Sequence, residues 1–308
     1  MEKIVFHGVI PPVITPLTED FEVDVPSLER VIERLITAGV DGLFVLGSTG
    51  EVAFLDARQR ATVLEVAVHL SGGRLPVLAG IVDTSTDRCI GHGRMAERAG
   101  ADAAVLTAPF YTRTSQPEIA EHFRQVHAAL ALPLVAYDLP VSVHSKLERE
   151  TVMELADDQV IAGLKDSSGD EPNFRGVLLG TRALQGFSVL TGSELTADAA
   201  LLMGAHGLVP GLANVDPWGY VRLQRAAERG NWVVARAEQE RLYQLFAITA
   251  VGRPRTSPGA AGIGGFKTAL QLLGVIQTNL TARPQRRLDA GEVRSVELIL
   301  TRHGLQAA

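Results

Sequence analysis

The stretch that decides the fold is Val160-Ile161-Ala162-Gly163-Leu164-Lys165-Asp166-Ser167, an apolar run that ends in a lysine. Short apolar runs bounded by polar turns are typical of strands that are buried on both faces of a parallel sheet. Similar runs recur along the chain, each followed by a segment with helical spacing of apolar residues. They predict strands over Val9–Thr15, Gly42–Leu46, Pro76–Ile81, Ala103–Thr107, Leu134–Tyr137, Ile161–Lys165, Ser188–Thr191 and Gly207–Pro210.

Amphipathic segments separate these strands, as at Ser27–Ala38, Asp56–Leu70 and Gln116–Leu130. Successive strands begin roughly 20 to 35 residues apart, which is room for one strand, one helix and two loops. Eight such units joined by right-handed crossovers predict an α/β fold of the (β/α)8 TIM-barrel type. The alternative is an open doubly wound sheet, which usually has a glycine-rich turn after its first strand. Here Thr15-Pro16-Leu17 stands in that place, so we favour the barrel.

The strand pattern stops after about Val215. Helical patterns follow over Asp216–Gly230, Asn231–Val251, Gly265–Leu273 and Glu292–His303, and the Pro- and Gly-rich stretch Gly252–Gly265 indicates a loop. We therefore expect a barrel carrying the active site over residues 1–225 and a C-terminal helical extension over residues 226–308.

Composition excludes several classes of function. Net charge is −6, from 29 Lys+Arg against 35 Asp+Glu, and the sequence has no basic cluster of the kind that binds nucleic acid or an anionic membrane. Cys89 is the single cysteine, so an intrachain disulfide or a cysteine zinc site cannot form. The histidines do not follow a metal-ligand pattern. Without an apolar signal core or a membrane-length apolar stretch, a soluble, cytoplasmic protein is expected.

Polar groups at the carboxyl ends of barrel strands are the first candidates for chemistry, because active sites of such barrels lie there. Lys165 closes an apolar strand and points either into the barrel mouth or outward, where it would pair with Asp166. Inside a barrel, partial desolvation lowers the pKa of an amine and frees it to attack a carbonyl carbon. Tyr137 ends the preceding strand, as a core tyrosine or as an acid/base group.

The turn Gly47-Ser48-Thr49-Gly50-Glu51 follows the second strand. It is either a tight loop before a helix or an anion site. In the second case, two hydroxyls and freed backbone N–H groups converge where the glycines let the chain bend. A carboxylate or a phosphate would fit such a nest.

Taken in order, Gly-Ser-Thr-Gly-Glu at 47–51, Pro109-Phe110-Tyr111, Tyr137-x-x-Pro140 and Gly163-x-Lys165-Asp166 resemble the dihydrodipicolinate synthase / N-acetylneuraminate lyase family of class I pyruvate-dependent aldolases. The resemblance extends from about Val9 to Val215. It implies that Lys165 forms a Schiff base and that Tyr137 shuttles protons. Gly47, Ser48 and Thr49 would hold the carboxylate of pyruvate or of a longer 2-oxo acid.

The resemblance also implies an assembly. Tyr111 matches the tyrosine that in many members reaches into a neighbouring subunit's site, so a homo-oligomer, a tetramer, is expected. Neither a cofactor nor a metal is expected, because the protonated imine is itself the electrophile.

Two departures from the family pattern bear on the substrate. The lysine-pathway synthases carry an arginine two positions beyond the proline of Tyr-x-x-Pro, and here that position is Ser142. The sialic acid lyases carry two acids after the glycine of the seventh strand, and here Gly192 is followed by Ser193 and Glu194. We therefore expect a lyase that cleaves or dehydrates another 2-oxo acid, in first place a pyruvate-forming 2-keto-3-deoxy sugar acid aldolase.

In that case Ser193, Glu194 and Val209 of the last strand would contact substrate. The other interpretation of Ser193-Glu194 is a helix cap. Lys146 or Arg113 could supply the missing positive charge, which leaves dihydrodipicolinate synthase activity as the alternative. His144 either faces the site or lies on the surface.

Two further classes remain open. A non-catalytic 2-oxo-acid-binding homologue could keep the barrel, but it would not need both Lys165 and Tyr137. A nucleotide site would rest on the glycine-rich stretch Gly259–Gly265, which follows no predicted strand and is therefore a weak signal.

Overall fold

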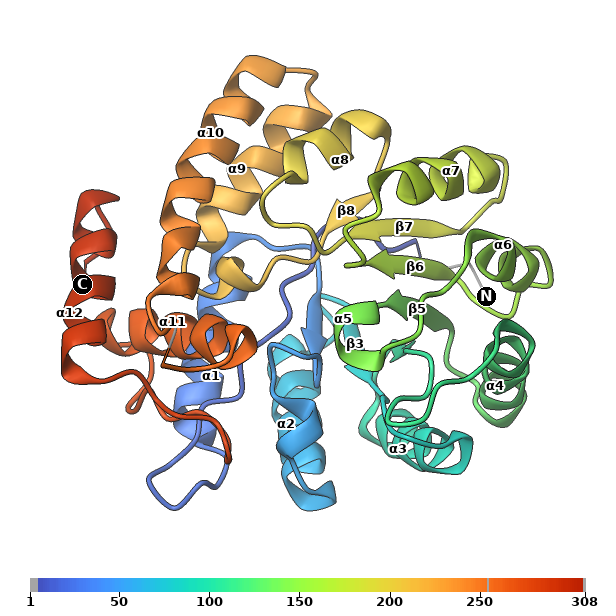
Figure 1. Ribbon diagram of the computed structural model, residues 1–308, viewed down its shortest axis with the longest axis horizontal. Helices are drawn as coiled ribbons and strands as arrows, with labels where there is room; N and C mark the ends of the chain where they lie inside the picture. Colours follow the sequence, from blue (N-terminus) through green and yellow to red (C-terminus); the bar gives the residue numbers. More distant parts are fainter. Residues whose placement is uncertain (1–4, 254, 307–308) are drawn as a thin grey trace.

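The computed structural model describes residues 5–253 and 255–306. Within this part of the chain, eight parallel strands form one sheet in the order β1-β8-β7-β6-β5-β4-β3-β2. A parallel bridge between Pro12 and Phe44 joins the two ends of that order and closes the barrel. Figure 1 shows the helices packed around the strands. The predicted (β/α)8 barrel is confirmed.

The strands are shorter than predicted. Their bounds are β1 Gly8–Val9, β2 Leu43–Val45, β3 Val77–Gly80, β4 Ala103–Leu106, β5 Leu134–Asp138, β6 Gly163–Asp166, β7 Ser188–Thr191 and β8 Gly207–Leu208. The prediction of a first strand through Thr15 was wrong, because Pro11 and Pro12 lack the N–H groups that a regular ladder needs. Val13 N and Phe44 N nevertheless donate to Phe44 O and Pro11 O, which holds β2 against this extended segment.

A helix follows each strand and covers the barrel. The main ones are α1 Val25–Ala38, α2 Ala57–Ser71, α3 Thr86–Ala99, α4 Gln116–Ala129, α6 Arg149–Asp157, α7 Glu171–Thr181, α8 Ala197–Met203 and α9 Pro217–Glu228. Local sequence fixes where several of them begin: Asp56 with Gln59 and Ser115 with Glu118 form capping boxes at α2 and α4. Three short turns follow β2, β5 and β8. α5 Pro140–Val143 and η2 Gly211–Asn214 begin just after their strands, whereas η1 Val52–Phe54 follows β2 after the Gly47–Glu51 turn.

The C-terminal extension consists of α10 Trp232–Leu245, η3 Phe246–Ala250, α11 Pro258–Leu272 and α12 Ala290–Arg302. The prediction of a loop over Gly252–Gly265 was wrong beyond Ser257, since α11 begins at Pro258 with Ser257 as its cap. One of its glycines, Gly265, allows close packing, because a Cβ there would lie 2.3 Å from Ile248 O of η3. The glycine-rich stretch Gly259–Gly265, on which a nucleotide site would have rested, is therefore part of a helix and not a loop.

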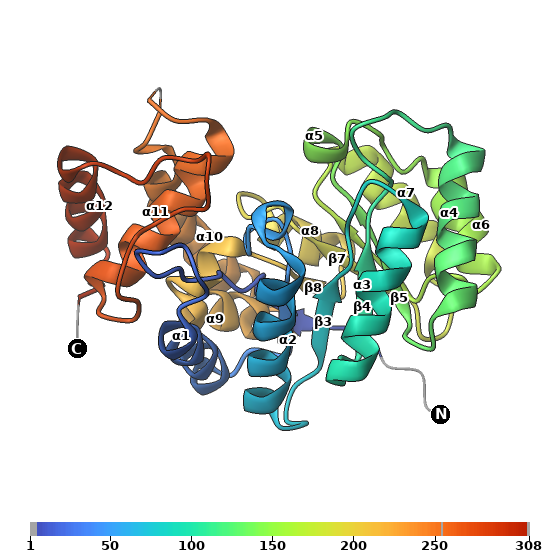
Figure 2. The ribbon, with the colours of Figure 1, turned by 90° about the horizontal axis from the view of Figure 1, so that it is seen from below.

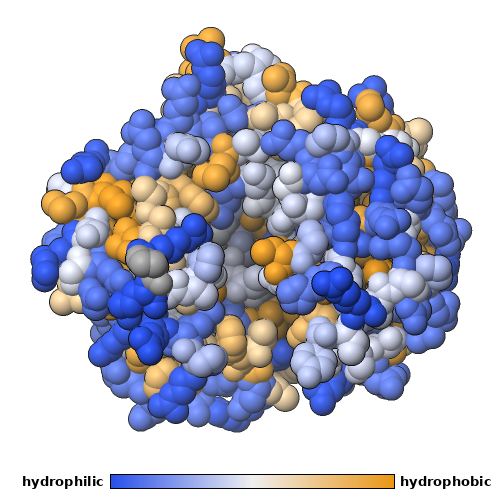
Figure 3. Space-filling model, viewed as in Figure 1, coloured by the Kyte–Doolittle hydropathy of each residue, from blue (hydrophilic) through white to orange (hydrophobic). Residues whose placement is uncertain are grey.

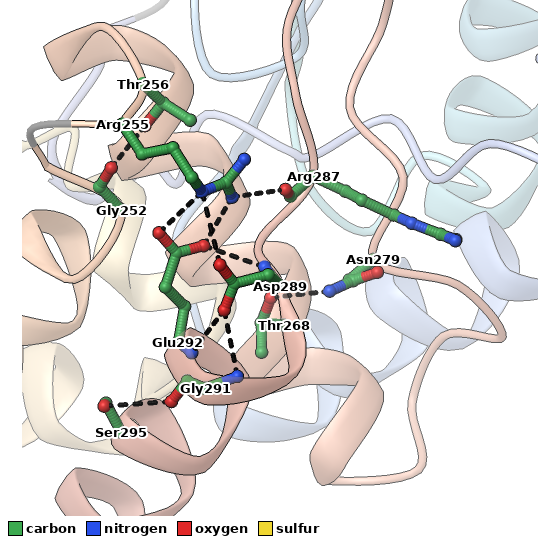
Figure 4. Close-up of polar contacts among 10 residues, drawn as sticks. All are labelled: Gly252, Arg255, Thr256, Thr268, Asn279, Arg287, Asp289, Gly291, Glu292 and Ser295. Carbon is green, nitrogen blue, oxygen red and sulfur yellow. Dashed lines mark hydrogen bonds and ion pairs between the residues drawn. The ribbon is translucent and has the colours of Figure 1, made fainter.

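An arginine organises the polar part of this extension. Arg255 donates to Glu292 Oε1 at 2.9 Å and to Arg287 O at 2.8 Å, and it lies 3.4 Å from Asp289 Oδ2, so the segment before α11 is tied to the start of α12 (Figure 4). In Figure 2, α5 stands above the strands and α11 lies at the left beside α12. None of the helices in the described ranges is long and apolar enough to cross a membrane.

Side-chain alternation divides the core in two. Outward-facing strand residues such as Leu134, Ala136 and Leu164 belong to the large cluster packed under the helices. Inward-facing ones, among them Phe44, Val135 and Tyr137, form a separate cluster inside the barrel. Lys165 follows the outward-facing Leu164 and is therefore on the inward side.

Candidate active site

Lys165 lies inside the barrel, near the carboxyl end of β6. Its side chain is 5% exposed. Its Nζ lies 3.9 Å from the ring centroid of Tyr137 and 4.7 Å from that of Phe44. Of the two orientations that the sequence left open, the structure has the inward one.

Tyr137 is the register partner of Lys165 across β5 and β6. Its ring meets Phe44 of β2 edge to face, with centroids 6.2 Å apart and an interplanar angle of 84°. The two aromatic faces form an apolar, electron-rich lining around the amine. Such a lining favours a cation at Nζ through the ring quadrupoles, whether the cation is an ammonium or a protonated imine.

The Gly47–Glu51 turn lies at the carboxyl end of β2, where Ser48 is exposed, Thr49 half-buried and Gly47 buried. Gly47 has no room for a side chain, because a Cβ there would lie 2.7 Å from the Phe44 ring. A Cβ at Gly211, after β8, would lie 3.4 Å from Thr49 Oγ1. The turn is therefore packed against the strand that lines the amine and against the end of β8.

Glu194 follows β7 and turns toward the end of β8. Leu212 N donates to its Oε1 at 2.6 Å. Burial raises the pKa of Glu194 to about 7, although that hydrogen bond and the charge of Lys165 favour the carboxylate. A carboxyl group that titrates near neutrality can either donate or accept a proton or a hydrogen bond.

The side chains of Ser193 and Glu194 point in different directions. Its hydroxyl pairs with that of Thr196 at 2.9 Å, and it lines a cavity of about 160 Å³ beside α7 and α8. Thr196, rather than Ser193, is the N-cap residue of α8. Val209 is buried in the same interior cluster as Phe44 and Tyr137, so it does lie with the residues around Lys165.

The positive charge near Ser142 belongs to Lys146, which already forms an ion pair with Asp138. Ser142 is exposed on α5. Lys146 Nζ lies 2.5 Å from Oδ2 of the buried Asp138 and 4.0 Å from Asp170 Oδ2. Leu147 N donates to the other oxygen of Asp138 at 3.1 Å. Lys146 therefore neutralises a buried carboxylate of this chain, whereas Arg113 is exposed on the loop before α4.

Tyr111 extends away from the chain. It is 90% exposed, and its φ of +80° is a left-handed backbone conformation that costs a non-glycine residue about 1 to 3 kcal/mol. His144 is also exposed, as the left-handed C-cap residue of α5.

The face that carries the carboxyl ends of the strands is hollowed at its centre, between α11 and α5 (Figure 3). A cavity of about 650 Å³ opens at the opposite end of the barrel, where Leu134 and Ile161 line it near the starts of β5 and β6, and it contains none of the candidate residues. Among residues 5–253 and 255–306, no three His, Cys, Asp or Glu side chains are grouped so that they could hold a metal ion.

Three features of the site were missed by the sequence analysis. Phe44 borders the amine, Asp138 holds Lys146, and Glu51 forms a fully buried ion pair with Lys267 of α11. Alternation along β2 could have marked Phe44 as an inward residue. The Glu51–Lys267 pair joins segments that are far apart in sequence, whereas Asp138 and Lys146 are eight residues apart on different elements; neither pair left a local pattern.

Fold and site together define a lyase barrel with a buried lysine at its carboxyl-terminal mouth. The chain belongs to the dihydrodipicolinate synthetase family, whose model matches residues 5–303. Members of this family are class I lyases that use pyruvate and a lysine Schiff base, so the expected family and enzyme class are confirmed.

Two relatives illustrate the similarity. The chain is 36% identical over 238 residues to the 4-hydroxy-tetrahydrodipicolinate synthase of Azoarcus sp. strain BH72, which covers 77% of this chain and 81% of that protein. It is 34% identical over 299 residues to an uncharacterized DapA-like lyase of Halobacterium salinarum, covering 97% of this chain and 94% of the relative.

Solved structures agree over nearly the whole length. YagE, a prophage protein of the dihydrodipicolinic acid synthase family from E. coli K12, solved in complex with pyruvate, superposes with a TM-score of 0.91 at 30% identity, covering 98% of this chain and 100% of YagE. The dihydrodipicolinate synthase of Bacteroides thetaiotaomicron gives a TM-score of 0.90 at 36% identity, with coverages of 96% and 98%.

Proposed function

We propose that Lys165 is the Schiff-base lysine of this lyase. The observation that carries the proposal is the position of its Nζ, buried in the barrel mouth between the Tyr137 and Phe44 rings. The amine adds to the C2 carbonyl of a 2-oxo acid, the Tyr137 hydroxyl donates its proton to the leaving hydroxyl, and water departs, which leaves a protonated imine at C2 and a Tyr137 phenolate. The aromatic faces stabilise that cation.

The imine then serves as an electron sink. Tyr137 accepts the proton of the C4 hydroxyl, the C3–C4 bond breaks, and its electron pair becomes the double bond of an enamine while an aldehyde leaves. Protonation at C3 and hydrolysis by one water return pyruvate and the free amine. In this assignment Ser48 and Thr49 hold the substrate carboxylate, supported by the backbone N–H groups of their turn.

The second half of the substrate is proposed to carry hydroxyl groups rather than a carboxylate. Ser142 offers no positive charge, and Lys146 is held by Asp138. Glu194 supplies a hydrogen-bonding group suited to hydroxyls. A 2-keto-3-deoxy sugar acid, cleaved to pyruvate and an aldehyde, meets these conditions.

A second candidate is 4-hydroxy-tetrahydrodipicolinate synthase activity, the condensation of pyruvate with aspartate semialdehyde. The names of the relatives favour it at least as strongly as the sugar acid. It requires that the carboxylate of the second substrate find a charged partner other than a residue at position 142, and the exposed Arg113 is the available one.

Two assays separate the candidates. Pyruvate release is measured from a panel of 2-keto-3-deoxy sugar acids, and condensation is followed with the next reductase of the lysine pathway as coupling enzyme. An unpaired carboxylate costs a few kcal/mol, about 10² to 10³ in rate. We expect cleavage of at least one sugar acid and negligible condensation; robust condensation abolished by Arg113→Ala would establish the synthase instead.

A further inference from the structure

Glu51, the last residue of the Gly47–Glu51 turn, is fully buried together with Lys267 of α11. The two side chains form an ion pair, and both are 0% exposed. Glu51 Oε1 also accepts a hydrogen bond from Ala282 N at 2.6 Å, and Lys267 Nζ donates to Leu280 O at 2.7 Å. The C-terminal extension thus contacts the end of the turn through one ion pair and one hydrogen bond, and the bond to Leu280 O holds the Lys267 amine in place.

The turn itself is strained at this point. Glu51 has a φ of +58°, a left-handed conformation that a residue with a Cβ adopts only when its surroundings hold it there. Glu51 N donates to Ser48 O at 3.0 Å, and Thr15 Oγ1 donates to Gly50 O at 2.8 Å. The conformation of Ser48 and Thr49 therefore depends on where Glu51 is held.

The neighbour of Lys267 on α11 touches the same region. A Cβ at Gly211 would lie 2.9 Å from the Phe266 ring on one side and 3.4 Å from Thr49 Oγ1 on the other. Helix α11 can reach this place because Gly265 lets it pack directly on η3. The helix thus supports the turn through Lys267 and the facing backbone through Phe266.

We propose that Glu51 and Lys267 are positioning residues, which fix the turn in the conformation that binds the substrate carboxylate. This inference rests on the proposed role of Ser48 and Thr49. Neither Glu51 nor Lys267 touches the reacting atoms, so loss of the pair weakens carboxylate binding and leaves imine chemistry at Lys165 intact.

The test uses trapping of pyruvate on Lys165 with borohydride, followed by mass spectrometry. Removing one charge alone leaves the other buried and unpaired, which destabilises a fold, so the main variant is the neutral double substitution Glu51→Gln with Lys267→Met. We expect the half-saturating pyruvate concentration to rise by about 10- to 100-fold, with the maximal trapped fraction unchanged. Hydroxyacetone, a ketone of similar size without a carboxylate, should be trapped equally by wild type and variant.

Arg255→Met is the matched control, because it removes the other charged cluster of the extension without touching the turn (Figure 4). It should lower the melting temperature and leave pyruvate half-saturation unchanged. If the double variant does not fold, Glu51→Asp is tested instead, because it keeps the negative charge and shortens the side chain by one methylene. We then expect the half-saturating pyruvate concentration to rise 5-fold or more.

Unchanged half-saturation in the folded double variant, or an equal loss of pyruvate and hydroxyacetone trapping, would overturn the inference. Absence of trapping in the wild-type protein would instead overturn the proposed function.

Discussion

Lys165 and Tyr137 are paired across β5 and β6, with the lysine Nζ 3.9 Å from the centroid of the tyrosine ring. The amine thus faces the ring, and a cation at Nζ is stabilised by the π-electrons. The same contact serves the ammonium and the protonated imine that replaces it. Since Phe44 adds a second face at 4.7 Å, the site is suited to the positive nitrogen of the protonated imine.

Lys165→Arg should abolish turnover while the fold is retained. The guanidinium keeps the positive charge between the two rings, but it cannot form an imine at neutral pH. Pyruvate formation and borohydride trapping, measured on protein with wild-type circular dichroism, are the readouts. Activity above a few per cent of wild type would exclude the Schiff-base assignment.

Tyr137→Phe should still trap pyruvate but cleave substrate about 10² to 10⁴ times more slowly, the usual contribution of a positioned acid/base group. The ring face over Nζ is kept, and only the hydroxyl is lost. Single-turnover cleavage measured beside trapping separates the two steps. Wild-type cleavage, or loss of trapping, would contradict the proposed division of roles.

Glu194→Gln should change how stability depends on pH. The pKa of Glu194 is about 7 in the folded protein and about 4.5 in the unfolded chain. Between these two pH values the unfolded chain has lost the Glu194 proton and the folded protein still binds it. The wild-type protein therefore loses stability between about pH 4.5 and 7, on the order of 2 kcal/mol after allowance for partial exposure, and the variant does not.

Urea unfolding of both proteins from pH 4.5 to 8 checks this. The difference in unfolding free energy, variant minus wild type, should grow with pH and level off above about 7. A difference that is constant with pH would show that Glu194 is ionised in the fold at pH 5.

Tyr111 is expected to act in the site of a neighbouring subunit of a homotetramer. Its 90% exposure and left-handed backbone are explained if assembly buries it. Lys165→Ala and Tyr111→Phe subunits should each be inactive alone or nearly so. Refolded as a mixture, they should regain activity, because hybrid contacts restore some complete sites.

Sedimentation of the mixture should show tetramers. An active monomer at micromolar concentration, or hybrids without regained activity, would be evidence against this arrangement.

Local sequence was sufficient for much of the architecture. Apolar runs and capping residues such as Asp56 and Ser115 act over a few neighbouring positions, so the places of the strands and the starts of several helices could be predicted. Family motifs added Lys165, Tyr137 and the Gly47–Glu51 turn. The division into residues 1–225 and 226–308 stays a prediction.

The tertiary structure decided the rest. Because β6 is apolar on both faces, its sequence does not show whether Lys165 points into the barrel or out toward the helices. Closure of the barrel places the Lys165 amine next to Phe44 of β2. The helix over Pro258–Gly265 forms despite its glycines, because packing on η3 outweighs their low helix propensity.

Buried charge pairs are the clearest case. Lys146 could have served the substrate, but the buried Asp138 holds it, and Lys267 reaches Glu51 across more than two hundred residues of chain. The sequence by itself determined which groups were present and on which element each stands. Which charges meet was decided by folding, because a buried charge needs a partner and only the closed barrel brings the two together.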